Sequence, residues 1–187
     1  MPAGFATASG TAYQFGLPSN LKFVANDGTV TDDGGLMRRW RYAITPSGPF
    51  CIIVGVEQAQ FTGQFPASVL ALFDAKTQPD QKTLRNAVMT PVPAGTIGGV
   101  DQESTFTGSL DDGTTFPAHL YQRKYLTTDR SLIALTVAGP ESHRAECQLS
   151  MIINTFSATG RQFTGATPKP SSTTSGIPAP GATDATG

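Results

Sequence analysis

The stretch TFPAHLYQRKYLT (residues 115–127) alternates between two kinds of side chain. Because successive side chains of a β-strand point to opposite faces of the sheet, the alternation predicts one long strand. Asp112-Gly113, just before it, is a favoured hairpin turn after a strand at 100–110, and SLIALTVAG (131–139) follows as the next strand. The stretch therefore predicts a sheet whose neighbouring strands are antiparallel.

One face of this strand is a candidate binding surface. It groups His119, Tyr121, Arg123 and Tyr125, while Phe116, Ala118 and Leu120 lie on the other face. Tyr and Arg are enriched among the residues that contribute most to protein–protein binding. The four residues are therefore a candidate protein-binding face, and the alternative is a sheet face that packs under a helix or meets solvent.

Further strands are expected from period-2 patterns and turn signals. They are predicted at 11–18, 21–26, 36–45, 50–57 and 88–99. In the strand at 36–45, Leu36, Trp40, Tyr42 and Ile44 form the expected core side, whereas Arg39 and Arg41 lie on the opposite face.

Two segments have helical spacing. Phe65, Val69, Leu72 and Phe73 form an apolar stripe within 65–78, and residues 79–87 could extend this helix. Ala145, Leu149, Ile152 and Phe156 form a second stripe within 141–156, with a stop signal at Gly160. The order β-β-β-β-α-β-β-β-β-α predicts an α+β fold, a mostly antiparallel twisted sheet with two principal helices packed on it.

Several motifs together resemble the PsbP-like (Mog/PsbP) superfamily, which includes bacterial lipoproteins of the LpqN and DcrB type. The motifs are YQFGLP (13–18), WRY (40–42), IIVGVE (52–57), the helical segment 65–78, GGVDQESTFTGSLDDG (98–113), LIALTVAGP (132–140) and MIINTF (151–156). The resemblance implies a twisted antiparallel sheet between helices, and a role in binding other proteins or as an accessory subunit. The resemblance implies a PsbP-like α+β domain over residues 10–163, preceded by a flexible N-terminus at 1–9. Residues 164–187 are almost entirely Pro, Ser, Thr, Gly and Ala, so we expect a flexible tail or linker there.

Composition and charge exclude some classes of function. Thirteen basic against fourteen acidic residues give a net charge of −1, which provides no basic field for nucleic acid. We see no signal peptide and no transmembrane segment, so localisation is open: cell envelope if a leader was removed, otherwise cytoplasmic or virion-associated. Cys51 and Cys147 are either a disulfide or two separate buried thiols, and two cysteines are too few for a Cys-x-x-Cys type of metal site.

Motifs for catalysis are missing from the sequence. His119 and His143 are the only histidines, with no His-Glu-x-x-His and no Gly-x-Ser-x-Gly sequence. The glycines of GTIGG (95–99) lack the Lys-Ser/Thr of a phosphate-binding loop. We therefore expect no catalytic, cofactor or metal residues, and a non-enzymatic protein-interaction or accessory domain with an unknown protein partner. The alternatives are a structural subunit of a larger assembly such as a virion tail or capsid, and a small-molecule binder or hydrolase around His119.

Overall fold

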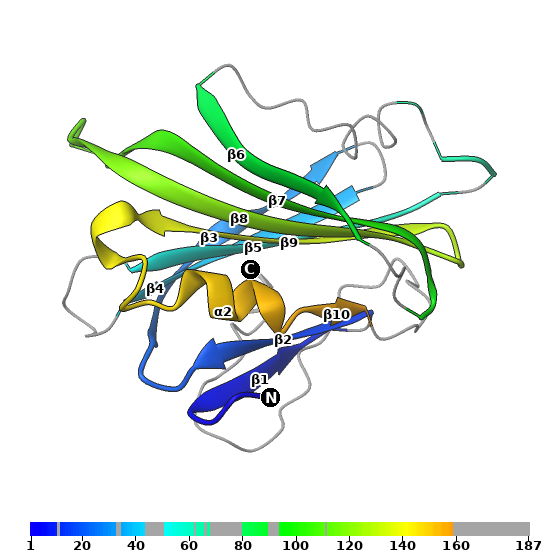
Figure 1. Cartoon of the computed structure of the whole chain (residues 1–187), viewed down its shortest axis with the longest axis horizontal. Helices are drawn as coiled ribbons and strands as arrows, with labels where there is room; N and C mark the ends of the chain where they lie inside the picture. Colours follow the sequence, from blue (N-terminus) through cyan, green and yellow to red (C-terminus); the bar gives the residue numbers. More distant parts are fainter. Residues whose placement is uncertain are drawn as a thin grey trace, which may run out of the picture.

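The chain folds into two antiparallel sheets with a short helical segment between them (Figure 1). The computed structural model describes residues 1–10, 12–32, 35–43, 51–61, 63–65, 67, 80–89, 94–110 and 112–158, and for 26–32 and 35–38 the backbone only. The smaller sheet has the order β1-β2-β10, formed by β1 (Phe5–Ser9), β2 (Tyr13–Pro18) and β10 (Ser157–Ala158). The larger sheet has seven strands in the order β3-β4-β5-β9-β8-β7-β6, with the bounds β3 (Lys22–Asp32), β4 (Gly35–Ala43), β5 (Ile52–Gln60), β6 (Gln81–Val88), β7 (Thr96–Ser109), β8 (Thr115–Thr127) and β9 (Ser131–Pro140).

The hairpin of β7 and β8 sets the register of the larger sheet. Ser109 pairs with Thr115 at the turn, and the pairing continues with Glu103 opposite Tyr121 and Asp101 opposite Arg123. The predicted turn is confirmed: Gly113 has a positive φ of 84°, and Asp112 Oδ1 accepts a hydrogen bond from the Thr114 N–H at 2.8 Å. Glycine is favoured at a positive φ because it has no Cβ to clash with the backbone.

The core lies on the face of the larger sheet that the helical segment and the smaller sheet cover. Helix α2 (Leu149–Asn154) lies between the two sheets (Figure 1). It buries Leu149, Ile152 and Ile153 against a cluster that includes Trp40 and Tyr42 of β4. The prediction that Trp40 and Tyr42 point into the core is confirmed, whereas Arg39 on the opposite face is exposed.

A disulfide between Cys51 and Cys147 joins the helical segment to the start of β5. The Cα atoms of the two residues are 6.1 Å apart, and both side chains are buried. Gly139 of β9 makes room for this junction, because a Cβ at that position would collide with the backbone carbonyl of Cys51. Two chain segments 96 residues apart in sequence are thus held together at this point.

The expected α+β, PsbP-like architecture with two principal helices is wrong. In the part of the chain that the structure describes, the helical elements with defined bounds are α2 and the short 3-10 helix η1 (Glu141–His143), and strands dominate. The helix expected over 141–156 is interrupted because Gln148 has a left-handed backbone with φ 54°, and Ala145 of its apolar stripe is exposed. None of the helices among the described residues is long and apolar enough to cross a membrane.

Other expectations for individual segments differ from the structure or lie outside it. Of residues 79–87, expected to extend a helix, 81–87 lie in β6, because pairing with β7 outweighs the helix preference of their Gln, Lys, Leu and Arg side chains. The strand expected at 88–99 is split between the end of β6 and the start of β7. Residues 5–9, expected to be flexible, form β1 and pair with β2. Most of the helix expected at 65–78, the stop signal at Gly160 and the tail at 164–187 lie outside the described residues.

Candidate functional site

The structure places His119, Tyr121, Arg123 and Tyr125 on one face of β8, as the alternation predicted. The exposed fraction is only 1% for His119 and 4% for both Tyr121 and Tyr125. Tyr125 stacks on Phe156 with ring centroids 5.4 Å apart, and its hydroxyl donates to the Phe156 carbonyl at 3.3 Å. This face therefore packs under the helical segment, which was the alternative to a protein-binding face.

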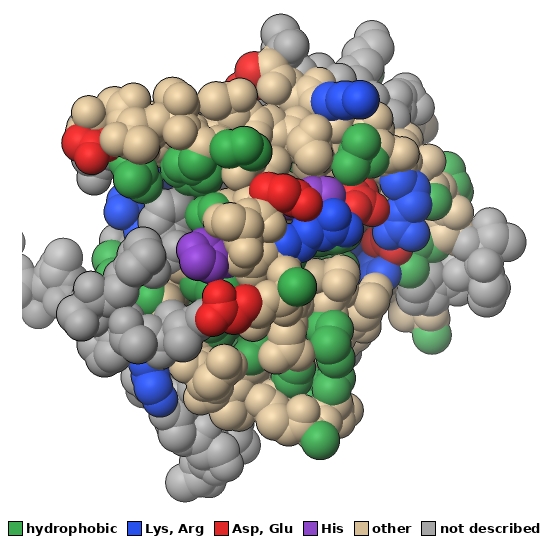
Figure 2. Space-filling model, turned by 60° about the vertical axis from the view of Figure 1, so that its left-hand side comes forward, with side chains coloured by type: hydrophobic (Ala, Val, Ile, Leu, Met, Phe, Trp, Pro, Cys, Tyr) green, Lys and Arg blue, Asp and Glu red, His purple; other side chains and the backbone are tan. Residues whose placement is uncertain are grey.

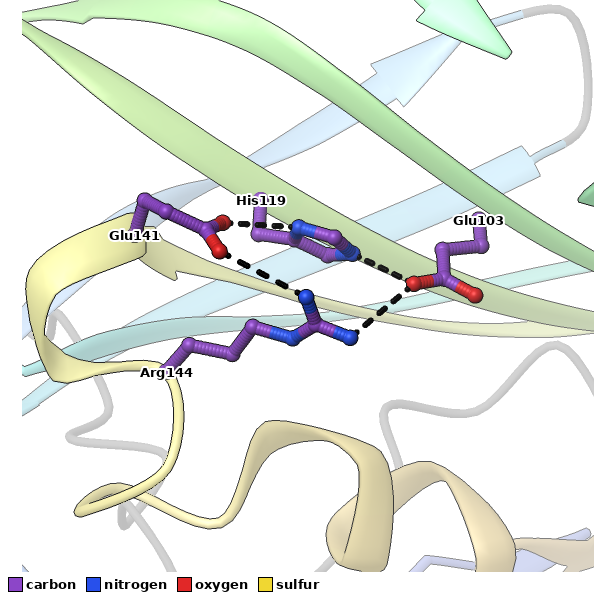
Figure 3. A network of polar contacts seen from close by, with 4 residues as sticks. All are labelled: Glu103, His119, Glu141 and Arg144. Atoms are coloured by element: carbon purple, nitrogen blue, oxygen red, sulfur yellow. Dashed lines mark hydrogen bonds and ion pairs between the residues drawn. The ribbon is translucent and has the colours of Figure 1, made fainter. Parts of the chain in front are cut away.

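His119 lies at the centre of a network of charged side chains (Figure 3). Its Nε2 lies 2.7 Å from Oε1 of Glu103 on β7, and its Nδ1 lies 2.8 Å from Oε2 of Glu141 at the start of η1. Arg144, just after η1, donates to Glu103 Oε1 at 3.2 Å and to Glu141 Oε1 at 3.4 Å. The network thus ties the segment after β9 to the centre of the β7–β8 hairpin.

Each of the two ring nitrogens of His119 faces a different carboxylate. A neutral imidazole donates from only one nitrogen, whereas an imidazolium donates from both. Because each ring nitrogen of His119 faces a carboxylate oxygen, the network is fully hydrogen-bonded when His119 is an imidazolium. Two carboxylates then balance one imidazolium and one guanidinium, and the group of four has no net charge.

The pKa of Glu103 is lowered below its ordinary value of about 4.5. Burial alone would raise it, but the hydrogen bonds from His119 and Tyr121 and the positive charges of His119 and Arg144 together outweigh burial. The guanidinium of Arg144 also lies over the ring of Tyr121, 5.5 Å from its centroid. The carboxylate of Glu103 is therefore held in its ionised form.

The position of His119 suits a structural role better than the role of a general base. A base needs a nitrogen that is free to accept a proton from a bound molecule. Both nitrogens of His119 already face carboxylates, and its side chain is almost fully buried. Sequence reasoning singled out His119 but missed Glu103, Glu141 and Arg144; counting back from the Asp112-Gly113 turn would have placed Glu103 opposite Tyr121.

Arg123 forms a second charged contact on the same face. Its guanidinium donates to both carboxylate oxygens of Asp101, at 2.6 and 2.8 Å, and reaches the Asn154 side chain at the end of α2 at 3.4 Å. The hydrogen bonds to Asp101 raise the pKa of Arg123, against the opposing effect of burial. This pair therefore supports the packing of α2 on the sheet.

Asp101→Asn is expected to lower the free energy of unfolding by about 1–3 kcal/mol, because one of two charge-assisted hydrogen bonds to Arg123 is lost. Urea unfolding of the variant and the wild type measures the difference. The matched control is Asp80→Asn, at an exposed position outside the pair, for which a change within about 0.5 kcal/mol is expected. Equal losses in the two variants would contradict the role given to the pair.

Strand β6 is a free edge of the larger sheet in the part of the chain that the structure describes, since its ladder partner is β7 alone. Two of its apolar side chains are exposed, Leu84 by 51% and Val88 by 71%. The Met89 N–H, directly after the strand, donates to the Gly99 carbonyl at 2.9 Å. By the alternation of backbone groups in an antiparallel pair, the N–H groups of Val88 and Asn86 point away from β7.

A cleft of about 640 Å³ opens at the beginning of this edge strand. Its walls come from the start of β6, the last third of β7, the start of β8 and η1, with the lining side chains Asp80, Lys82, Thr105, Thr107, Phe116, Pro117 and Glu141 among them. Glu141 therefore belongs both to this cleft and to the network around His119, whereas His119 itself does not line the cleft. The arrangement can receive a side chain of a segment that lies along β6.

Comparison with protein-family models and with curated proteins gives no match. Among solved structures, a protein from Bacteroides thetaiotaomicron VPI-5482 is similar with a TM-score of 0.42 and 10% sequence identity. The similarity covers 81% of this chain and 47% of that protein, so the chain spans about half the length of this structural neighbour. The resemblance to the PsbP-like superfamily stays a prediction.

Proposed function

We propose that the chain is a non-enzymatic protein-interaction domain that binds an extended segment of another protein as an additional strand beside β6. Among the described residues β6 has a free edge, and this edge carries the proposal, with outward N–H groups at Asn86 and Val88 and exposed apolar side chains at Leu84 and Val88. In strand addition, backbone hydrogen bonds supply much of the affinity, and pockets beside the edge supply specificity. The cleft at the start of β6 is such a pocket.

The opposite edge of the larger sheet is less suited to this role. That edge is β3, whose ladder with β4 has two register shifts, between Phe23 and Ala25 and between Asn26 and Gly28. β6 has one register shift, between Thr83 and Arg85, and regular pairing from Arg85 to Val88. Bulges disrupt the spacing of backbone groups along an edge and so hinder the addition of a strand.

Asn86→Pro is expected to weaken binding of an extended peptide at least tenfold, because proline removes one outward N–H and disturbs its neighbours. The probes are peptides of about 12 residues, selected against the wild-type chain from a random display library. Their affinities for both proteins are measured by fluorescence anisotropy. Asn86→Ala is the matched control, since it removes the same side chain but keeps the N–H, and its affinity is expected to stay near that of the wild type.

The fold of each variant is checked by circular dichroism and urea unfolding. Should Asn86→Pro fail to fold, the same peptides are tested on the wild type by hydrogen exchange, where the amides of Asn86 and Val88 are expected to become protected. A library that yields no binding peptide contradicts the proposal. Peptides that bind equally to both variants, or that leave these two amides unprotected, contradict it as well.

A further inference from the structure

We propose that the segment bound along β6 is acidic on one face, with Asp or Glu side chains beside Lys82 and Arg85. The inference rests on the strand addition proposed above and specifies the chemistry of its partner. Lys82 pairs with Thr105 and Arg85 pairs with Glu103, and paired residues of an antiparallel ladder share a face. The bulge between Thr83 and Arg85 brings Lys82 and Arg85 to the same face although they are three positions apart.

The carboxylates nearest to Arg85 are already engaged by other residues. Asp101 holds Arg123 through two short hydrogen bonds, and its distance to Arg85 Nη2 is 3.9 Å, at the outer limit of an ion pair. Glu103, directly opposite Arg85 in the ladder, is held by His119 and Arg144. The side chain of Arg85 remains 53% exposed and can therefore meet a carboxylate of an added strand.

Charged side chains of both signs gather on this part of the molecule. Figure 2 shows a group of basic, acidic and histidine side chains next to one another near the middle of the face in view. Because Arg85 pairs with Glu103 and lies 3.9 Å from Asp101, an added strand beside β6 would place alternate side chains next to Lys82 and Arg85 on this face. Carboxylates at these alternate positions would pair with Lys82 and Arg85, beside the network that Glu103, Glu141 and Arg144 form around His119.

A second copy of this chain is a poorer occupant of the edge. Pairing of β6 with β6 of another copy would bring two pairs of Lys82 and Arg85 together on adjoining strands. Like charges across neighbouring strands destabilise a sheet, and cations on an edge strand are a common protection against self-association. The same two cations that exclude a second copy attract an acidic strand.

The other face of the bound segment meets neutral groups. Thr83, Asn86 and Val88 pair with Ser104, Gln102 and Val100, so this side of β6 carries an amide, a hydroxyl and an apolar side chain. Thr or Val at the intervening positions of the partner fits these neighbours, because both residue types favour strands. The inferred partner segment therefore alternates carboxylates with Thr or Val over about the eight residues of β6.

The test uses three synthetic peptides of about nine residues with blocked ends. They carry Glu, Gln or Lys at alternate positions and Thr or Val between them, and are titrated into the full chain at low and at high salt. The Glu peptide is expected to bind about two- to thirtyfold more tightly than the Gln peptide, the range for two exposed charge pairs. The Lys peptide is expected to bind most weakly, and high salt should reduce the differences.

The double variant Lys82→Gln, Arg85→Gln is expected to bind the Glu and Gln peptides alike, with its affinity for the Gln peptide unchanged from the wild type. Equal binding of all three peptides to the wild type would overturn the acidic preference and leave strand addition standing. A Glu preference that persists in the double variant would overturn the role of Lys82 and Arg85. Absence of binding by all three peptides would contradict strand addition itself.

Discussion

Replacing Cys51 and Cys147 together by Ala is expected to lower the free energy of unfolding by about 3–5 kcal/mol. The disulfide joins residues 96 positions apart, and a crosslink over so long a loop removes much of the conformational freedom of the unfolded chain. Its loss also frees the segment between η1 and α2 from the start of β5. The double variant is therefore expected to unfold at a markedly lower urea concentration than the oxidised wild type.

Urea unfolding of the oxidised wild type, the reduced wild type and the double variant measures this effect. The reduced wild type is the matched control, because it lacks the crosslink but keeps both side chains, and it should unfold close to the double variant. A thiol titration of the denatured, unreduced wild type should find no free thiol. Two titratable thiols, or equal midpoints for oxidised and reduced protein, would contradict the disulfide.

Local patterns predicted the middle of the larger sheet well. The strand at 115–127 has the predicted bounds, because its alternation and the Asp112-Gly113 turn are both local signals. The burial of Trp40 and Tyr42 follows from the same period-2 pattern. Where neighbouring strands are joined by a tight turn, pairing and face can be read directly from the residues.

Features set by distant parts of the chain could not be read in this way. β5 pairs with β9, far along the chain, so β6 ends up at the edge of the sheet instead of beside β5. The composition of β6 favours a helix, and pairing with β7 outweighs that preference. The charge network depends on the path of the chain after β9, which brings Glu141 and Arg144 back onto β8. The sequence therefore pointed to His119 but not to its partners.

The network also explains why the face of β8, predicted as a candidate binding surface, is largely buried. Tyr121 and Arg123 are residue types common at interfaces, but here they face other parts of the same chain. Arg144 covers the ring of Tyr121, and Asp101 holds Arg123. Beyond them, Lys82 and Arg85 lie on the edge strand β6, where we propose that a partner binds.

His119→Ala is expected to lower the free energy of unfolding by about 2–4 kcal/mol at neutral pH. The variant loses the hydrogen bonds of both ring nitrogens to Glu103 and Glu141, and a hydrogen bond to a charged group contributes about 1.5–3 kcal/mol. The partial exposure of Glu141 reduces its share. The variant also loses the packing of the imidazole against Tyr121, where the ring centroids are 4.8 Å apart. The matched control is His143→Ala, whose exposed pairing with Glu146 should contribute little.

The pH dependence of stability separates a charged role of Glu103 in this network from a packing role. Because the pKa of Glu103 is lowered on folding, its ionised form contributes stability that is fully present above its unfolded pKa of about 4.5. This contribution is lost as the pH falls from about 4.5 through the lower folded pKa. Glu103→Gln is therefore expected to be less stable than the wild type at pH 6, and the gap should narrow as the pH falls below about 4.5. A gap of constant size between pH 6 and pH 3 in urea unfolding would contradict the charged network and leave only a packing role for Glu103.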